Sequence, residues 1–233
     1  MEKKIIAIGG GEIKNKTTLK IDEYIAGLAK LHAGDKRANA LFIGTASHDS
    51  MPYFNSFRKT YTSVFDIKAE VALIVYGEMN MEKIAGKIEA ADCIYVGGGD
   101  TVYMLEKWKE VGLTKLLIEA YEKGKIICGL SAGAICWFKD MYTDYEIMRG
   151  QSSEYVLRKG LGVLDGAMCP HFNEREEDFT AALKKGEIAG AYCVENDCAV
   201  EFTDGKMTKV ISAGGNAYYM ENKDGEIVKT ELL

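Results

Sequence analysis

A serine lies at the centre of a G-x-S-x-G pattern formed by Gly129, Ser131 and Gly133. Residues 126–130 predict a buried strand before this serine, and residues 134–138 predict a helix after it. A sharp strand-to-helix turn of this kind exposes the hydroxyl at the edge of a sheet, and only small residues fit where the two backbones approach. Ser131 is therefore a candidate nucleophile, although so short a pattern also occurs at tight turns without a catalytic role.

Three histidines could act as the base for such a serine: His32, His48 and His171. His32 closes a predicted helix, where a cation suits the helix dipole, and is expected at the surface. His48 and His171 each follow a predicted strand, and the carboxyl ends of parallel strands form the usual ligand-binding edge of a sheet. His171 is the better candidate and His48 the reserve, while the alternative for His171 is a capping or core histidine.

A third group must hold the imidazole of the base in the correct tautomer, and in serine hydrolases this group is a carboxylate. Five acidic residues are candidates: Asp140, Asp144, Asp165, Glu195 and Asp197. Glu195 directly follows a buried-strand pattern, so it should emerge at the same sheet edge as the serine and the base. Spacing alone does not select Glu195 over Asp144, because most charged residues at strand ends are solvated turn residues.

Two glycine triplets, at residues 9–11 and 97–99, each follow a predicted strand. Neither fits the G-x-G-x-x-G dinucleotide pattern or the G-x-x-x-x-G-K-[ST] phosphate loop, so nucleotide binding is weakly supported. The second triplet is well placed to supply an oxyanion donor, in addition to the N–H of Ala132 behind the serine. For the first triplet, a simple tight turn is about as good an interpretation.

The elements that must position these residues alternate along most of the chain. Up to about residue 140, short apolar runs alternate with helical patterns, which predicts right-handed βαβ units and a parallel sheet buried on both faces. Beyond that point short strands dominate. Asp204-Gly205 and Asp224-Gly225 predict hairpin turns, so the C-terminal part should be mostly antiparallel. Without a linker or repeat, residues 1–233 are expected to form a single α/β domain.

Composition limits the classes of function that remain. Apolar residues make up 47% of the 233 residues and charged residues 27%, which is ordinary for a globular protein and excludes a disordered or fibrous chain. A formal charge of −6 argues against nucleic-acid or anionic-membrane partners, and no apolar run reaches the roughly 18 residues of a membrane span. The N-terminus does not resemble a signal peptide, so we expect a cytoplasmic protein.

Six cysteines are present, and none of their spacings is CxxC. Most lie in apolar runs, so they are expected to be buried free thiols in a reducing compartment. The nearest pair, Cys193 and Cys198, has no partner pair elsewhere, which makes a zinc site a poor interpretation. No metal and no other cofactor is therefore expected.

Four motifs together resemble the peptidase E (aspartyl dipeptidase) family of serine peptidases, which also contains cyanophycinase. They are IGGG at residues 8–11, IYVGGGDT at 94–101, GLSAGA at 129–134 and CPHF at 169–172. The match covers most of the chain, and the order and spacing of the last three motifs are specific. The resemblance implies the fold of class I glutamine amidotransferases. That fold is a flavodoxin-like three-layer α/β sandwich with a mainly parallel central sheet, here followed by antiparallel C-terminal strands.

For catalysis, the resemblance implies a Ser–His–Glu triad that maps onto Ser131, His171 and Glu195. It also implies an oxyanion hole formed by the N–H groups of Gly99 and Ala132. In this scheme the histidine deprotonates the serine, the serine attacks the scissile carbonyl, and water later clears the acyl-enzyme.

For the substrate, the resemblance implies that Arg175 meets a carboxylate. Asp100, which stands where the family usually has Asn, is expected at the same site. Peptidase E removes an N-terminal aspartate from dipeptides, so the leading expectation is a peptidase for short peptides, dipeptides with N-terminal Asp among them. A small peptide is the expected partner, and the protein is expected to be a monomer or a homodimer.

Two other functions remain open from the sequence. An esterase of the α/β-hydrolase type would carry its histidine near the C-terminus, and no histidine follows His171. A non-catalytic ligand-binding or sensor module could retain the fold, although an intact serine and histidine favour an enzyme. Turnover of a peptide library distinguishes the two classes.

Overall fold

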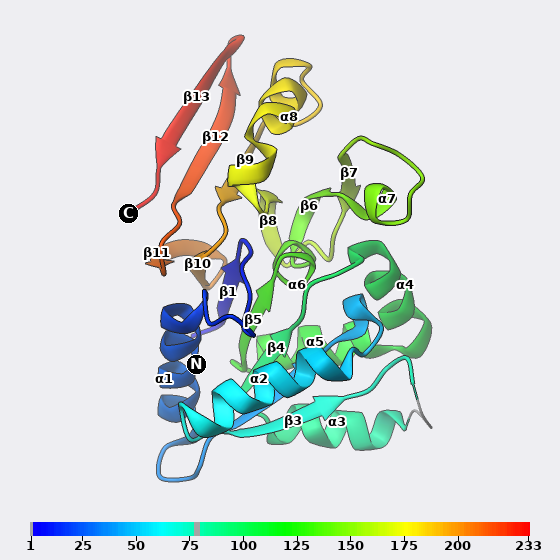
Figure 1. The fold of residues 1–233 in the computed structure, drawn as a ribbon, viewed down its shortest axis with the longest axis vertical. Coiled ribbons are helices and arrows are strands. Elements are labelled where there is room, and N and C mark those ends of the chain that lie inside the picture. The colour runs from blue at the N-terminus through cyan, green and yellow to red at the C-terminus, as the bar shows by residue number, and fades with distance from the viewer. Residues whose placement is uncertain (1, 77–79) are drawn as a thin grey trace.

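The computed structural model describes residues 2–76 and 80–233 of the chain. Its elements, shown in Figure 1, alternate between strands and helices at first and become mostly strands toward the C-terminus, as predicted. In chain order they are β1 (Lys4–Ile8), α1 (Leu19–Ala33), β2 (Asn39–Ile43), the 3₁₀ turn η1 (Thr45–Ser47), α2 (Met51–Ser63), β3 (Lys68–Ala72), α3 (Met81–Ala90), β4 (Cys93–Val96), α4 (Thr101–Val111), α5 (Leu113–Glu122), β5 (Ile126–Leu130), α6 (Ala132–Ile135), β6 (Phe138–Thr143), α7 (Tyr145–Met148), β7 (Val156–Lys159), β8 (Leu164–Cys169), α8 (Phe172–Lys184), β9 (Gly190–Val194), β10 (Cys198–Thr203), β11 (Lys206–Ser212), β12 (Ala217–Lys223) and β13 (Glu226–Glu231).

Seven strands form the main sheet, in the order β11-β10-β1-β5-β4-β2-β3. Five strands, β1, β5, β4, β2 and β3, are parallel to one another. Beyond β1, the antiparallel strands β10 and β11 extend the sheet. Helices α1 and α2 cover one face, where Ile25 and Phe57 join one apolar cluster, and α3, α4 and α5 cover the other around Trp108. The predicted α/β sandwich with a mainly parallel sheet is confirmed.

A second sheet has six strands, in the order β13-β12-β9-β8-β6-β7. Its middle strands β6, β8 and β9 are parallel, whereas β7, β12 and β13 are antiparallel to their neighbours. Helix α8 packs against it through Phe172, Phe179 and Leu183. The antiparallel C-terminal strands are thus present, but they are divided between two sheets, and Figure 1 shows the β12–β13 hairpin beside α8.

Both predicted hairpin turns are confirmed. Asp204-Gly205 joins β10 to β11 and Asp224-Gly225 joins β12 to β13, and all four residues have positive φ, between 50° and 93°, as a two-residue type I′ turn requires. The helix predicted over residues 134–138 is wrong at its C-terminal end. Helix α6 ends at Ile135, and Phe138 begins β6 because it is drawn into pairing with Leu164 of β8.

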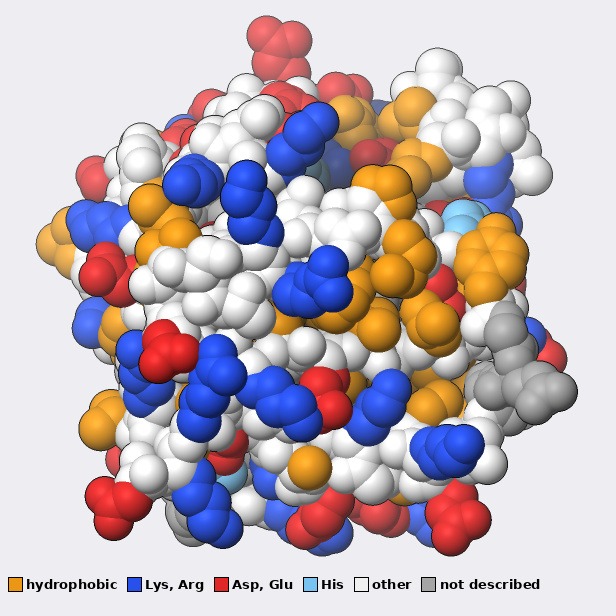
Figure 2. Space-filling view, turned by 60° about the horizontal axis from the view of Figure 1, so that its bottom comes forward, with side chains coloured by type: hydrophobic (Ala, Val, Ile, Leu, Met, Phe, Trp, Pro, Cys, Tyr) orange, Lys and Arg blue, Asp and Glu red, His pale blue; other side chains and the backbone are white. Residues whose placement is uncertain are grey.

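The surface carries charges of both signs. Figure 2 shows Lys and Arg interspersed with Asp and Glu over one face, with hydrophobic side chains gathered along its right half. Interspersed charges give no large single-sign field on this face. Within the described residues, no helix combines the length and apolar character that crossing a membrane requires.

Candidate active site

Ser131 occupies a strained turn between β5 and α6. Its φ of 52° and ψ of −110° lie outside the regions that L-residues favour, and such backbone strain is typical of functional sites. The turn is tight enough that a Cβ on Gly129 would lie 2.1 Å from the carbonyl oxygen of Gly133. The small residues of the G-x-S-x-G pattern therefore serve the close approach that the sequence predicted.

His171 meets Ser131 directly. Its Nε2 lies 2.9 Å from the serine Oγ, and its own φ of 49° places it as the N-cap residue of α8. Burial lowers the pKa of the His171 imidazole below its ordinary value, and the positive charge of Arg175 acts in the same direction. A lowered pKa keeps the imidazole neutral at pH 7, which is the form that can accept a proton.

The group that orients His171 is Asn196, not Glu195. His171 Nδ1 lies 2.7 Å from Asn196 Oδ1, whereas Glu195 Oε2 accepts hydrogen bonds from the main-chain N–H of Asn216 at 2.8 Å and its side-chain amide at 3.2 Å. The expected contact between Glu195 and His171 is therefore wrong, and the next residue, Asn196, makes this contact instead. Asn196 forms a bridge with Gly10 at the end of β1, and because side chains alternate along an extended chain, Glu195 points the other way.

A carboxylate, that of Glu174, is linked to His171 through Asn196. The Asn196 side-chain amide donates a hydrogen bond to Glu174 Oε1, and Glu174 lies in the first turn of α8. An ionised carboxylate only accepts hydrogen bonds, so the Asn196 NH₂ group must face Glu174 and its oxygen must face His171. The oxygen then receives the Nδ1 proton of His171 and leaves Nε2 free to accept the Ser131 proton.

Two of the other acidic candidates pair with basic residues, and none of the four contacts His171 in the described structure. Asp140 pairs with Lys159 at 2.6 Å and Asp144 pairs with Arg175 at 2.8 Å. Asp165 is exposed on β8, and the Asp197 main-chain N–H donates to the Gly10 carbonyl. None of these four side chains has a described hydrogen bond to His171.

The first glycine triplet joins the separate parts of the site. Three consecutive carbonyl groups, of residues 8, 9 and 10, accept hydrogen bonds from the main-chain N–H groups of Ser131 at 2.9 Å, His171 at 3.0 Å and Asp197 at 3.1 Å. A Cβ on Gly10 would lie 2.0 Å from Asn196 Oδ1 and 2.4 Å from His171 Nδ1. This triplet is more than a tight turn, because its first two glycines, together with Ile8, hold the loops that carry Ser131, His171 and Asn196 together.

Ser131 and His171 open into a cavity of about 530 Å³. Its lining comes from the loop after β1, the start of α2, the β4–α4 turn, the elbow and the β6–α7 junction: Gly11, Glu12, Ile13, Lys14, Pro52, Tyr53, Ser56, Gly98, Gly99, Leu130, Ser131, Asp144, Met148 and His171. Gly99 thus borders the cavity beside the serine, and Ala132 opens α6, where the first N–H groups of a helix have no partner within it. Both N–H groups belong to segments that meet at the serine.

Arg175 and Asp100, both expected to meet substrate, have partners inside the protein. Arg175 is 3% exposed and bonds Asp144, and Asp100 caps α4 by accepting from the Tyr103 N–H while its other oxygen binds Arg149 at 2.6 Å. Neither belongs to the described lining of the cavity. Both side chains therefore have partners within the protein.

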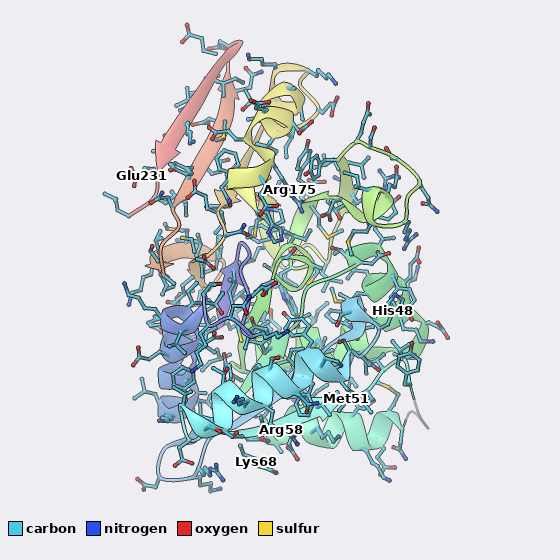
Figure 3. All side chains as sticks on the ribbon, viewed as in Figure 1. His48, Met51, Arg58, Lys68, Arg175 and Glu231 are labelled. Carbon is cyan, nitrogen blue, oxygen red and sulfur yellow. The ribbon has the colours of Figure 1, made fainter. Side chains whose placement is uncertain are left out.

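The remaining histidines lie outside the described cavity lining. His48 is exposed and stacks on Tyr103, with ring centroids 4.2 Å apart, and His32 pairs with Asp92 at 2.9 Å. Figure 3 shows His48 well separated from Arg175, which lies one turn past the base. Of the three histidines, the structure brings only His171 to the serine.

Asn196 and Glu174 were missed from the sequence. A carboxylate was expected at this position, although an amide takes the same position in the Cys-His-Asn arrangement of other hydrolases. The available signal was that Asn196 sits at a strand end between Glu195 and Asp197, which were both candidates for the orienting group. Glu174 had no signal of its own beyond its place in an acidic first helical turn.

Comparison with known proteins gives consistent results. The family model described as Peptidase family S51 matches residues 5–210. An uncharacterized peptidase of Bacillus subtilis (strain 168), YgaJ, is 29% identical over 236 residues, which cover 99% of this chain and 97% of that protein. An uncharacterized peptidase of Listeria innocua, Lin0382, is 26% identical over 184 residues, covering 64% and 88% of the two chains.

Solved structures share the fold. A peptidase E protein from Listeria monocytogenes EGD-e aligns over 100% of both chains with a TM-score of 0.59 and 19% identity. A peptidase from an acI-B1 actinobacterium aligns over 100% of this chain and 94% of that chain, with a TM-score of 0.67 and 18% identity. At these identities the likeness concerns the fold alone.

Proposed function

The chain belongs to peptidase family S51, the peptidase E family, and on this premise we propose that it hydrolyses short peptides with Ser131 as nucleophile and His171 as general base. The observation that carries the proposal is the 2.9 Å contact between Ser131 Oγ and His171 Nε2, at the edge of a cavity of about 530 Å³. A neutral imidazole within hydrogen-bond reach of a strained, cavity-facing serine is the arrangement that activates a hydroxyl for acyl transfer.

The reaction follows from the positions of these atoms. His171 Nε2 takes the Ser131 proton while Oγ attacks the scissile carbonyl carbon, which gives a tetrahedral intermediate. The intermediate collapses, the C–N bond breaks, and His171 returns the proton to the leaving amine. Water then attacks the acyl-enzyme carbonyl while His171 accepts a proton from it. The ester C–O bond breaks, His171 returns the proton to Ser131 Oγ, and the acid is released.

Gly99 and Ala132 are the proposed oxyanion donors. The Gly99 N–H comes from the turn after β4 and the Ala132 N–H from the start of α6, so two separate segments would hold the same oxygen. Loss of one such donor in a serine protease costs roughly 3–4 kcal/mol of transition-state stabilisation. Because both donors are main-chain groups, they need no rearrangement when the negative charge develops.

Asn196 would act as the positioning group for His171. A neutral amide fixes the imidazole tautomer but places no full charge beside the imidazolium that forms during the reaction. Glu174 supplies that negative charge one hydrogen bond further away. The chain therefore divides between two residues the work that one carboxylate does in a Ser–His–Asp triad.

A short peptide is the substrate class that the cavity supports best. Its volume falls within the range typical of small-ligand sites, and its lining mixes apolar side chains with a few charged ones. The preference for N-terminal Asp depended on a free Arg175, and that side chain is paired with Asp144.

The six buried free thiols match the expectation and support a reducing compartment such as the cytoplasm.

Covalent labelling tests the proposal. A fluorophosphonate reagent should modify Ser131, located by mass spectrometry of the digested protein, and the same preparation should cleave peptides from a library of di- to pentapeptides. Both signals should disappear in Ser131→Ala and persist in Ser63→Ala, which removes an exposed hydroxyl at the end of α2. A folded protein that binds peptides without labelling or turnover would instead be a binding module.

A further inference from the structure

Asp144 is the charged side chain that β6 and α7 bring to the catalytic cavity. It follows the last residue of β6, and it lines the same cavity as Ser131 and His171. Its side chain is 32% exposed, so a ligand can reach it. The other charged residues of the lining, Glu12 and Lys14, come from the loop after β1 and are exposed to solvent.

Arg175 contacts Asp144 and is held within the protein by both of its terminal nitrogens, while its buried Nε has no partner among the described residues. Its Nη2 donates to Asp144 Oδ2 at 2.8 Å, its Nη1 donates to the Tyr142 carbonyl at 3.4 Å, and its guanidinium lies 4.8 Å from the ring centre of Tyr155. The side chain is only 4% exposed. A substrate carboxylate that paired with Arg175 Nη2 would have to take the place of Asp144, because Asp144 Oδ2 already accepts from that nitrogen.

Asp144 therefore presents a hydrogen-bond acceptor to the cavity. One of its oxygens, Oδ2, is used by Arg175, and no hydrogen bond to Oδ1 occurs within the described part of the chain. An ionised carboxylate oxygen accepts hydrogen bonds and attracts cations, and it repels another carboxylate. At Asp144 the cavity thus offers the opposite of what an N-terminal aspartate side chain requires.

We infer that Asp144 is a subsite for a cationic nitrogen of the peptide substrate, held in place by the buried Arg175. This inference rests on the proposed peptidase function and names its substrate class. The cation can come from the free α-ammonium group of the peptide or from a lysine or arginine side chain. The apolar surfaces of Pro52 and Met148 in the same lining suit the methylene stem of such a side chain.

Four p-nitroanilides separate these sources: leucine, N-acetyl-leucine, N-acetyl-arginine and aspartate p-nitroanilide. If the α-ammonium group binds, kcat/KM for the leucine compound should exceed that for its acetylated form by roughly ten- to a hundredfold, the range of a charge-assisted hydrogen bond. If a basic side chain binds, the acetyl-arginine compound should exceed acetyl-leucine by a similar factor. A preference for the aspartate compound, or no discrimination among the four, overturns the inference without any variant.

Asp144→Asn then assigns the discrimination to this residue. The amide keeps an oxygen acceptor for Arg175 but carries no charge, so the preferred ratio should fall to within a few-fold of one. Asp140→Asn is the matched control, because Asp140 lies on β6, is paired with Lys159 of β7 and lies outside the described lining. A ratio that survives in a folded Asp144→Asn protein would show that the Asp144–Arg175 pair is only structural.

Fluorophosphonate labelling keeps the two proposals distinguishable. If Ser131 is labelled in the unaltered protein and in Asp144→Asn, the catalytic machinery is intact in both, and an unchanged ratio overturns the subsite alone. If the unaltered protein is neither labelled nor active, the proposed function falls and the subsite falls with it. If Asp144→Asn fails to fold, the ratios measured on the unaltered protein still decide whether a cation is selected.

Discussion

The elbow and the orienting half of the site are built in different ways. Ser131 owes its position to its immediate neighbours, since a strand, two glycines and a helix lie within a few residues of it. His171 is positioned by groups far from it in sequence, with Asn196 lying 25 residues away and Ser131 lying 40 residues away. A nucleophile can therefore be recognised from a short motif, whereas the group that orients its base depends on how distant strands align.

Removing the nucleophile should have the largest effect. Ser131→Ala deletes the hydroxyl that attacks the carbonyl, and we expect kcat to fall by roughly 10⁴-fold or more. The fold should persist, because the Ser131 contacts described here to β1 and α6 are made by main-chain atoms. Peptide hydrolysis and circular dichroism on the same preparation check both points. More than a few per cent of residual activity would remove Ser131 from the mechanism.

Substitution of Asn196, one of two neighbouring candidate residues after β9, should have the next largest effect. Asn196→Ala removes the acceptor for His171 Nδ1, and we expect kcat to fall by roughly 100-fold because the imidazole loses its fixed tautomer. Glu195→Gln is the control, since Glu195 bonds Asn216 and should change kcat by no more than a few-fold. The reverse ranking, in two folded variants, would return the orienting role to Glu195.

Glu174→Gln should have a smaller effect. The glutamine can still accept from the Asn196 amide, but it loses the negative charge and can present its own NH₂ group. We expect kcat to fall by about tenfold, the scale of one hydrogen bond to a charged group. Glu177→Gln, on the same helix and exposed, should leave kcat unchanged. Equal effects of the two substitutions would mean that Glu174 is an ordinary surface residue of the helix.

The pH dependence should show the smallest change. Activity requires neutral His171, and its pKa is lowered from 6.5 by burial and by Arg175. A lowered pKa keeps the imidazole neutral to a lower pH, so the acid limb of kcat/KM against pH should have its midpoint below 6.5. Because the charge of Glu174 raises this pKa, Glu174→Gln should move the limb further to acid. A limb above 6.5, or a shift to alkaline pH in the variant, would contradict this account.

Local patterns predicted much of the fold and half of the site. The buried strand before Ser131, the turn and the two Asp-Gly hairpins depend on neighbouring residues, so the sequence was enough to locate them. The second sheet was not predicted, because the parallel pairing of β6, β8 and β9 joins segments whose contacts no local pattern shows. The C-terminal end of α6 was predicted too far along the chain for the same reason, since Phe138 pairs with Leu164 of β8.

The site residues divide along the same line. His171 was expected near Ser131 because both follow predicted strands of one parallel sheet. The two residues do meet, but β5 and β8 belong to different sheets, and both loops bond the main chain at residues 8 and 9. The choice between Glu195 and Asn196 depended on a single bridge to Gly10, which decides which of two successive side chains faces the base. Arg175 was expected to meet substrate because of its charge and its distance from His171, but Asp144, brought close by the second sheet, had already paired with it. The sequence shows that a charged residue is present, but it does not show which residue pairs with it.

The three carbonyl groups of residues 8–10 also bear on when, during synthesis and folding, the candidate active site is assembled. They belong to the first strand to be synthesised, yet the N–H groups that bind them come from residues 131, 171 and 197. Contacts this distant form late in folding, because long loops must close first. A nascent chain that has reached the elbow therefore carries its serine without the base or the amide. On the proposed mechanism, hydrolysis requires the C-terminal strands to have joined the rest of the chain.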